Sequence, residues 1–95
     1  MNIPQSLDDI SSNLNRIVNF YIRGSNINFH FVTESIQLIS EISFESLSQN
    51  LQQILNSTLK LLETLVTEKT LTYDLADDAL TFSTILSSHA RFLRI

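Results

Sequence analysis

Three aspartates late in the chain have the spacing best suited to chemistry. Asp74, Asp77 and Asp78 stand at i, i+3 and i+4, so a helix would place them on one face. Grouped carboxylates serve as general acids and bases or bind hard cations such as calcium. Aspartate is also favoured in the first turn of a helix by the helix dipole, and the same holds for Asp8 and Asp9. We expect this dipole role, with no catalytic or metal site.

The two histidines, His30 and His89, lack the sequence context of known metal sites. Neither follows a glutamate by three residues, as in di-iron bundles, and they are not four residues apart, as on a zinc-protease helix. His89 falls near the end of a predicted helix, where an imidazole can cap carbonyl groups. We expect His89 to be a partly buried, hydrogen-bonded histidine. A metal-binding bundle that uses His89 with the three aspartates is the weaker alternative.

The composition does not favour catalysis by a nucleophile, nor catalysis on a bound phosphate. The chain has no cysteine and only one glycine. A nucleophile elbow needs flanking glycines and a phosphate-binding loop needs several. Without cysteine there is no disulfide framework and no thiolate metal site. We therefore expect a protein that is not an enzyme and has no cofactor.

The charge balance bears on the possible partners. The net charge is −4, and the six Lys and Arg residues are scattered. Arg16 with Arg23, and Arg91 with Arg94, come closest to a basic patch, but both pairs lie late in predicted helices, where they suit the dipole. Nucleic acids require clustered cations, and anionic membrane surfaces repel acidic helices. No apolar run approaches the roughly 18 residues of a membrane span. We expect neither nucleic acid nor membrane as a partner.

A length of 95 residues with one proline and one glycine predicts a single all-α domain over 1–95. The first helix is predicted over 6–23, with Ser6 as its N-cap and Gly24 as its stop. Its apolar seam repeats at helical intervals and comprises Leu7, Ile10, Leu14, Ile17 and Tyr21.

The segment 26–31 alternates polar and apolar residues, which is the period of a strand. No second alternating run exists in the chain to satisfy the backbone of such a strand. We therefore predict a loop that leads into the second helix, with Ser25, Asn26 or Asn28 as the cap. The alternative is a strand that pairs with its own copy across a dimer axis.

Two further helices are predicted between residues 32 and 68. The second carries Val32, Ile36, Ile39 and Ile42, and the phase then shifts at Ser43. We predict a break around 40–44, with a stutter in one continuous helix as the alternative. The third helix has an apolar face wide enough for two neighbours, which predicts a central position. That face comprises Leu51, Ile54, Leu55, Leu59, Leu61, Leu62, Leu65 and Val66.

A turn at 68–72 and a fourth helix complete the predicted elements. Asp74, Asp77 and Asp78 are expected in the first turn of this helix. Its predicted seam again follows helical intervals, and Ala76, Ile85, Ala90 and Phe92 broaden it. The seam comprises Leu75, Ala79, Phe82, Leu86, His89 and Leu93.

The surface between Arg23 and Lys60 is unusually poor in charge. It contains no Lys or Arg, and its acids are Glu34, Glu41 and Glu45. The whole chain is 17% charged, against about 25% for an average domain. Such a surface is typical of one that meets another protein. We expect three or four antiparallel amphipathic helices, completed by oligomerisation. The expected interface residues are Leu51, Leu55, Leu59, Leu62, Val66, Phe29 and Phe31.

These features favour a non-catalytic protein–protein interaction module, namely a small adaptor, a chaperone-like partner or an assembly subunit. Its partner is expected to be a second copy, most simply in a dimer, or another helical protein with coiled-coil-like contacts. The alternative is a structural subunit of a larger assembly, such as a secretion-system or virion component. The first residues lack a basic start and an apolar run, so no signal peptide is expected and a cytoplasmic location is predicted.

Overall fold

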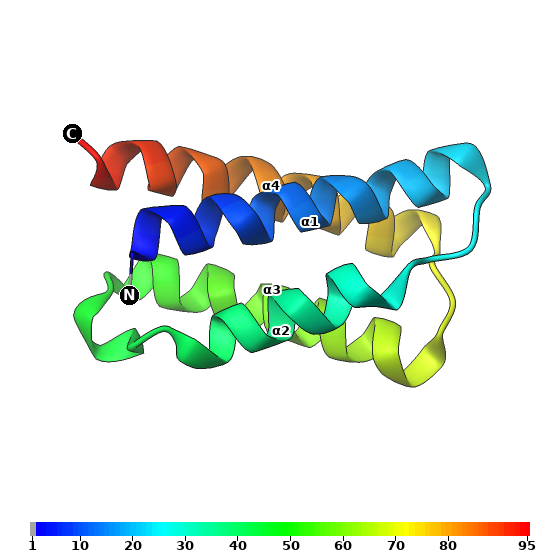
Figure 1. Ribbon diagram of the computed structural model, residues 1–95, viewed down its shortest axis with the longest axis horizontal. Helices are drawn as coiled ribbons and strands as arrows, with labels where there is room; N and C mark the ends of the chain where they lie inside the picture. The colour runs from blue at the N-terminus through cyan, green and yellow to red at the C-terminus, as the bar shows by residue number, and fades with distance from the viewer. Residues whose placement is uncertain (1) are drawn as a thin grey trace.

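The computed structural model describes residues 2–95, which form an antiparallel four-helix bundle (Figure 1). Its helices are α1 (Ile3–Arg23), α2 (Phe29–Glu41), α3 (Gln49–Glu68) and α4 (Tyr73–Leu93), with a short 3-10 turn η1 (Phe44–Ser46). Each helix packs mainly against two others, in the cyclic order α1, α2, α3, α4. The predicted all-α bundle is therefore confirmed. The third helix has two neighbours as predicted, but so has every other helix, and α3 is not central.

The start of α1 differs from the prediction. The helix begins at Ile3 rather than at Ser6, because Asn2 is its N-cap and accepts a hydrogen bond from the backbone N–H of Gln5 at 3.0 Å. Pro4 lies in the first turn, where its missing N–H costs nothing. Ser6 is instead buried inside the helix.

The other ends of the helices follow local capping signals. Gly24 ends α1 with φ +66°, the left-handed conformation that glycine adopts without strain. Asn28 caps α2 and accepts from the N–H of His30 at 3.0 Å, which confirms one of the three predicted caps. Because Phe29–Phe31 is already helical, the alternative strand over 26–31 is wrong.

The predicted break between the second and third helices is confirmed. α2 ends at Glu41, and α3 begins at Gln49 with Ser48 as its N-cap. The turn before α4 is also confirmed: Lys69 ends α3 with φ +56°, and Thr72 caps α4. A positive φ is unusual for lysine and strains the backbone.

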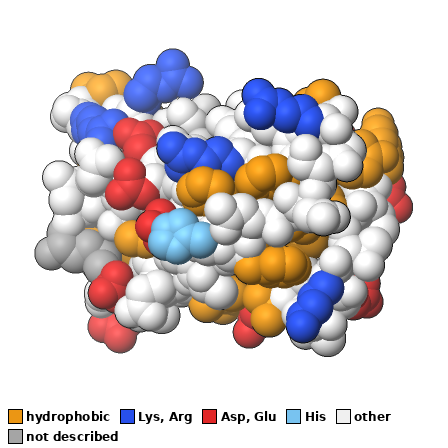
Figure 2. Space-filling model, turned by 45° about the vertical axis from the view of Figure 1, so that its right-hand side comes forward, with side chains coloured by type: hydrophobic (Ala, Val, Ile, Leu, Met, Phe, Trp, Pro, Cys, Tyr) orange, Lys and Arg blue, Asp and Glu red, His pale blue; other side chains and the backbone are white. Residues whose placement is uncertain are grey.

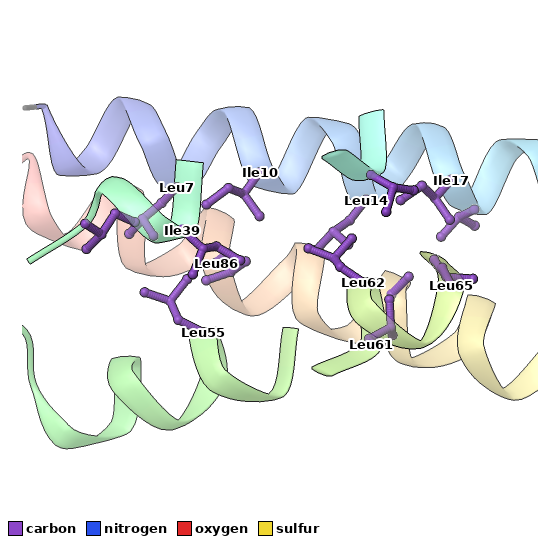
Figure 3. Close-up of a cluster of buried hydrophobic side chains, with 14 of the residues drawn as sticks. Leu7, Ile10, Leu14, Ile17, Ile39, Leu55, Leu61, Leu62, Leu65 and Leu86 are labelled. Atoms are coloured by element: carbon purple, nitrogen blue, oxygen red, sulfur yellow. The ribbon is translucent and has the colours of Figure 1, made fainter. Parts of the chain in front are cut away.

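The hydrophobic core lies along the bundle axis and is built largely from α1 and α3. Figure 3 shows Leu7, Ile10, Leu14 and Ile17 of α1 reaching toward Leu55, Leu61, Leu62 and Leu65 of α3, with Ile39 and Leu86 between them. The predicted seam of α1 is buried at its first four positions. Its fifth, Tyr21, is 38% exposed because it lies near the end of the helix.

The buried face of α4 is rotated from the predicted seam. Its buried positions are Ala76, Ala79, Ser83, Leu86 and Ala90. Leu75, Phe82 and His89 are only partly buried, and Leu93 is 48% exposed. The predicted seam is confirmed at Ala79 and Leu86, and Leu75 and Phe82 pack against the same core. It is wrong at Leu93, because α4 turns its small residues toward the interior.

The small residues of α4 accompany its extensive contact with α1. The Ser11 hydroxyl donates to the Ser83 carbonyl at 2.9 Å, and the two hydroxyl oxygens lie 3.0 Å apart. The Ser83 hydroxyl is also within donating distance of the Asn15 Oδ1, at 2.9 Å. These bonds join the two helices inside the bundle, and every buried side-chain polar atom of the described residues has a partner.

Four helices of one chain are enough to close this core. The described residues expose 5,724 Å², whereas a compact monomer of this mass is expected to expose about 5,500 Å². The apolar ridges therefore need no second chain to cover them. Oligomerisation is not needed to close the core, and association between copies stays a prediction.

Candidate interaction surface

The three aspartates do not form a site. Asp74, Asp77 and Asp78 are all exposed, and only Asp74 lies in the first turn of α4. Within residues 2–95, no group of three or more His, Cys, Asp or Glu side chains is arranged to hold a metal ion. Asp8 and Asp9 also lie beyond the first turn of α1, because that helix starts early. Asp8 instead forms an ion pair with Arg94.

The two histidines lie at opposite ends of the bundle, which is 37 Å long. The side chain of His30 is 68% exposed at the start of α2, and its Nε2 lies 3.5 Å from a carboxylate oxygen of Glu34. His89 is partly buried near the end of α4, as expected for a histidine on a helix face. Their separation excludes a site shared by both within one chain.

A polar cluster that the sequence did not predict joins α1 to α2. The Asn13 amide donates to Glu34 at 2.9 Å and to the Ser35 hydroxyl at 3.1 Å, and it accepts from Arg16 at 2.9 Å. The Arg16 guanidinium lies 5.0 Å from the centre of the Phe31 ring, within cation–π range. These hydrogen bonds within the chain join α1 to α2 and help to fix their packing.

The residues predicted as an interface divide into two groups. Leu51, Leu55 and Leu62 are buried within the chain, and Leu59 and Phe29 are partly buried against the same core. Phe31 lies under Arg16 and beside Phe20, and Val66 is 39% exposed. The structure does not gather these residues into one accessible patch.

An apolar surface recess lies at the end of the bundle where α4 finishes. We call it the η1–α4 groove. Its apolar wall is formed by Ile3, Pro4, Leu47, Leu51, Phe92 and Leu93, and Ser46, Ser48 and His89 complete it. Its volume is about 390 Å³. The groove thus draws on both ends of the described chain and on the connection between α2 and α3.

Phe92 is the most prominent side chain of this groove. It is 76% exposed, and Leu93 beside it is 48% exposed. Both lie outside the buried face of the same helix, to which Ala90 belongs. Single exposed apolar residues are common on protein surfaces, but here an exposed phenylalanine adjoins an apolar recess. Contiguous apolar patches of this kind mark interaction sites.

The opposite end of the bundle has a smaller aromatic feature. The rings of Tyr21 and Tyr73 meet edge to face with their centroids 6.3 Å apart. The recess beside them includes the polar residues Asn26, Lys69 and Thr70. The surface at this end is therefore more polar than the η1–α4 groove.

The exposed charges are mixed in sign. On the face drawn in Figure 2, acidic side chains lie among the basic ones, and hydrophobic side chains reach the surface between them. A surface of this kind does not present the continuous basic track that a phosphate backbone requires. No helix within residues 2–95 combines the length and the hydropathy that a membrane crossing requires.

Comparison of the chain with protein-family models, curated proteins and solved structures finds no match. The surface of the molecule is therefore the guide to its function. The sequence gives a partial signal for the groove, because the predicted apolar seam of the fourth helix includes His89 and Leu93 and is broadened by Phe92. It did not show that Phe92 and Leu93 would remain exposed, because that depends on which face of α4 meets α1.

Proposed function

We propose that this chain is a non-catalytic protein-interaction module that binds its partner through the η1–α4 groove. The observation that carries the proposal is Phe92, an aromatic side chain 76% exposed at the edge of an apolar groove of about 390 Å³. Aromatic anchors that fit apolar pockets supply much of the binding energy in protein interfaces. Burying one aromatic side chain removes about 150–250 Å² of surface from water.

The walls of the groove suit recognition of an apolar segment or helix. Leu47, Leu93 and Ile3 would give affinity, and the uncharged Ser46 and Ser48 would set the register. A small adaptor, a chaperone-like protein or an assembly subunit works in this way. The absence of cysteine fits a reducing compartment, and we place the module in the cytoplasm.

A second candidate function is a structural subunit of a larger assembly. It is favoured by the exposed aromatic pair Tyr21 and Tyr73 at the end opposite the groove. Two different contact surfaces at the two ends of one elongated bundle would join copies head to tail. Such contacts produce open filaments or closed rings.

The test compares three forms of the full chain carrying an affinity tag: wild type, Phe92→Ser and Leu80→Ser. Leu80 is the matched control because it is also an apolar residue of α4 and is 48% exposed. We expect wild type and Leu80→Ser to retain the same cross-linked partner, whether a second copy or another protein, and Phe92→Ser to lose it. Equal binding by all three forms, or none by wild type, would refute the proposal. Circular dichroism confirms that each variant is folded.

A further inference from the structure

We infer that the last turn of α4 is a flap, held closed beside the η1–α4 groove by an ion pair between Arg94 and Asp8. We call residues 91–95 the α4 flap. The flap carries Phe92 and Leu93, which line the groove, so its position decides whether the groove is complete. The regulatory part of the inference rests on the proposed function, whereas the flap itself can be observed in the chain alone.

The flap is not anchored in the hydrophobic core. The buried face of α4 ends at Ala90, and residues 91–95 are all exposed. Phe92 and Leu93 lie outside the core cluster and outside the side chains packed against it. Burial of apolar side chains is the main force that holds the helices of a protein in place. The flap lacks this force, which fixes the rest of α4 to α1.

The backbone of the flap has the weaker bonding pattern of a helix end. The N–H of Arg94 donates to the carbonyl of Arg91 at 3.2 Å, and the N–H of Ile95 donates to the carbonyl of Phe92 at 3.3 Å. These bonds span three residues, as in a 3-10 helix, and their geometry is poorer than that of α-helical bonds. Fraying ends of this kind open at a free-energy cost near zero. The open and closed forms of the flap are therefore close in free energy.

One ion pair ties the flap to another helix. The guanidinium of Arg94 donates to the carboxylate of Asp8 in α1. Asp8 stands four residues after Pro4, so it lies one helical turn from a residue that lines the groove. Within residues 2–95, no other hydrogen bond or ion pair joins the flap to another helix. The pair thus joins the end of α4 to α1 beside the groove (Figure 1).

The strength of this pair suits a reversible closure. The two side chains are 44% and 35% exposed, and a pair of this kind changes an equilibrium by about twofold to fivefold. Such a factor matters little for the folding of the whole chain. For a flap whose two forms are otherwise equally populated, it raises the closed fraction from one half to about two-thirds to five-sixths. Because salt screens exposed charges, the flap should open as ionic strength rises.

The state of the flap controls the groove. Opening removes Phe92 and Leu93 from the groove wall, so the recess is incomplete in the open form. A partner that binds the complete groove finds only the closed fraction of the molecules, and its apparent affinity falls in proportion. Binding should therefore weaken with salt although the groove lining contains no Lys, Arg, Asp or Glu.

The experiment is NMR spectroscopy of the isotope-labelled full chain without a partner. Cα chemical shifts and heteronuclear NOEs of residues 91–95 report the open and closed forms. We expect Asp8→Asn to raise the ratio of open to closed about twofold to fivefold at about 20 mM salt. Asp9→Asn is the matched control and should leave the ratio unchanged, because Asp9 accepts from Gln5 within α1. At about 1 M salt the wild type should match Asp8→Asn, and that variant should respond little to salt.

A double-mutant cycle tests whether the pair acts directly. Arg94→Gln should open the flap as much as Asp8→Asn, and the double variant should be no more open than either single variant. Arg91→Gln removes a charge from the same turn and leaves the pair intact, so it should open the flap less. Additive effects of D8N and R94Q, an equal opening in Asp9→Asn, or a flap that stays helical in D8N would overturn the inference.

Other outcomes separate the flap from the proposed function. A flap that opens in Asp8→Asn, in a chain that captures no partner through Phe92, would refute the proposed function and leave the flap standing. Phe92-dependent capture by a chain whose flap ignores D8N would refute the flap and leave the interaction module standing. Where both are found, the dissociation constant of the partner should rise as the closed fraction falls. A constant that does not change would overturn the regulatory role.

Discussion

α3 and α4 are neighbouring helices of 20 and 21 residues, yet they bury opposite kinds of side chain. The buried face of α3 consists of five leucines and Thr58. The buried face of α4 consists of three alanines, Ser83 and a single leucine, Leu86. α3 therefore fills the core with its own side chains, whereas the small residues of α4 let its backbone approach α1.

This difference decides what remains on the surface. Because α4 turns its small residues inward, larger apolar residues of the same helix, Leu80, Phe92 and Leu93, are left exposed. On α3 the leucines point inward, and Val66 is its one large apolar residue that is substantially exposed. The exposed apolar surface of α4 thus follows from its close packing on α1. Four substitutions compare the two packing modes and the helix ends beside them.

The largest effect is expected from shortening a buried leucine of α3. Leu62→Ala should lower the free energy of unfolding by about 2–5 kcal/mol, because Leu62 is fully buried and the cavity cannot collapse completely. Urea unfolding followed by circular dichroism measures this loss. Val66→Ala, on the exposed side of α3, is the control and should cost under about 1 kcal/mol. Equal costs for both would mean that α3 does not anchor the core.

Enlarging a small residue of α4 tests the opposite packing mode. Ala79→Leu should destabilise the protein by about 1–3 kcal/mol, since Ala79 is fully buried and α1 must move to admit a larger side chain. Thr81→Leu adds a similar apolar side chain at an exposed position of α4 and should have little effect. A stabilising Ala79→Leu would contradict close packing of α4 on α1. The same urea titration reports both variants.

Removing the buried hydroxyl of Ser83 should cost about 1 kcal/mol. Ser83→Ala removes a hydroxyl that can donate to Asn15 Oδ1 or to the Ser11 carbonyl and that contacts the Ser11 hydroxyl. Ser11 can still donate to the Ser83 carbonyl. The exposed Ser88→Ala is the control. A double-mutant cycle with Ser11→Ala measures the coupling between the two serines, and additivity would show that the pair does not link α1 to α4.

The smallest effect is expected where α3 ends. Lys69 has φ +56°, and Lys69→Gly should stabilise the protein by about 0.5–1 kcal/mol, because relief of left-handed strain exceeds the entropic cost of glycine. Gly24→Ala is the mirror experiment at the end of α1 and should destabilise by about 1 kcal/mol. Thermal and urea unfolding are sensitive enough for both. A Lys69→Gly variant less stable than wild type would indicate that the lysine side chain contributes more than the strain costs.

Much of the helical pattern could be predicted because caps and stops are local. Gly24 and Asn28 each mark an end through their own backbone preferences or side-chain hydrogen bonds. The start of α1 was missed because Ser6 and Asn2 are both good caps, and only the folded helix shows which one is used. The break after α2 was visible as a change of phase, which reflects the period of the helix itself.

The candidate site was less predictable, because it depends on distant parts of the chain. The η1–α4 groove combines Ile3, Leu47 and Phe92, which are far apart in sequence. The predicted interface centred on Leu51, Leu55 and Leu62, since these residues form the strongest apolar stripe. That stripe is instead buried in the core, where large side chains fill the space between the helices.

Composition and local spacing were enough to predict an all-α chain and the approximate ends of its helices. These properties depend on composition and on interactions between residues a few positions apart. The buried side of α4 could be seen only in the folded bundle, since it depends on how closely α1 approaches that helix. The exposure of Phe92 follows from that choice, because a helix that turns its alanines inward must carry its larger side chains outside.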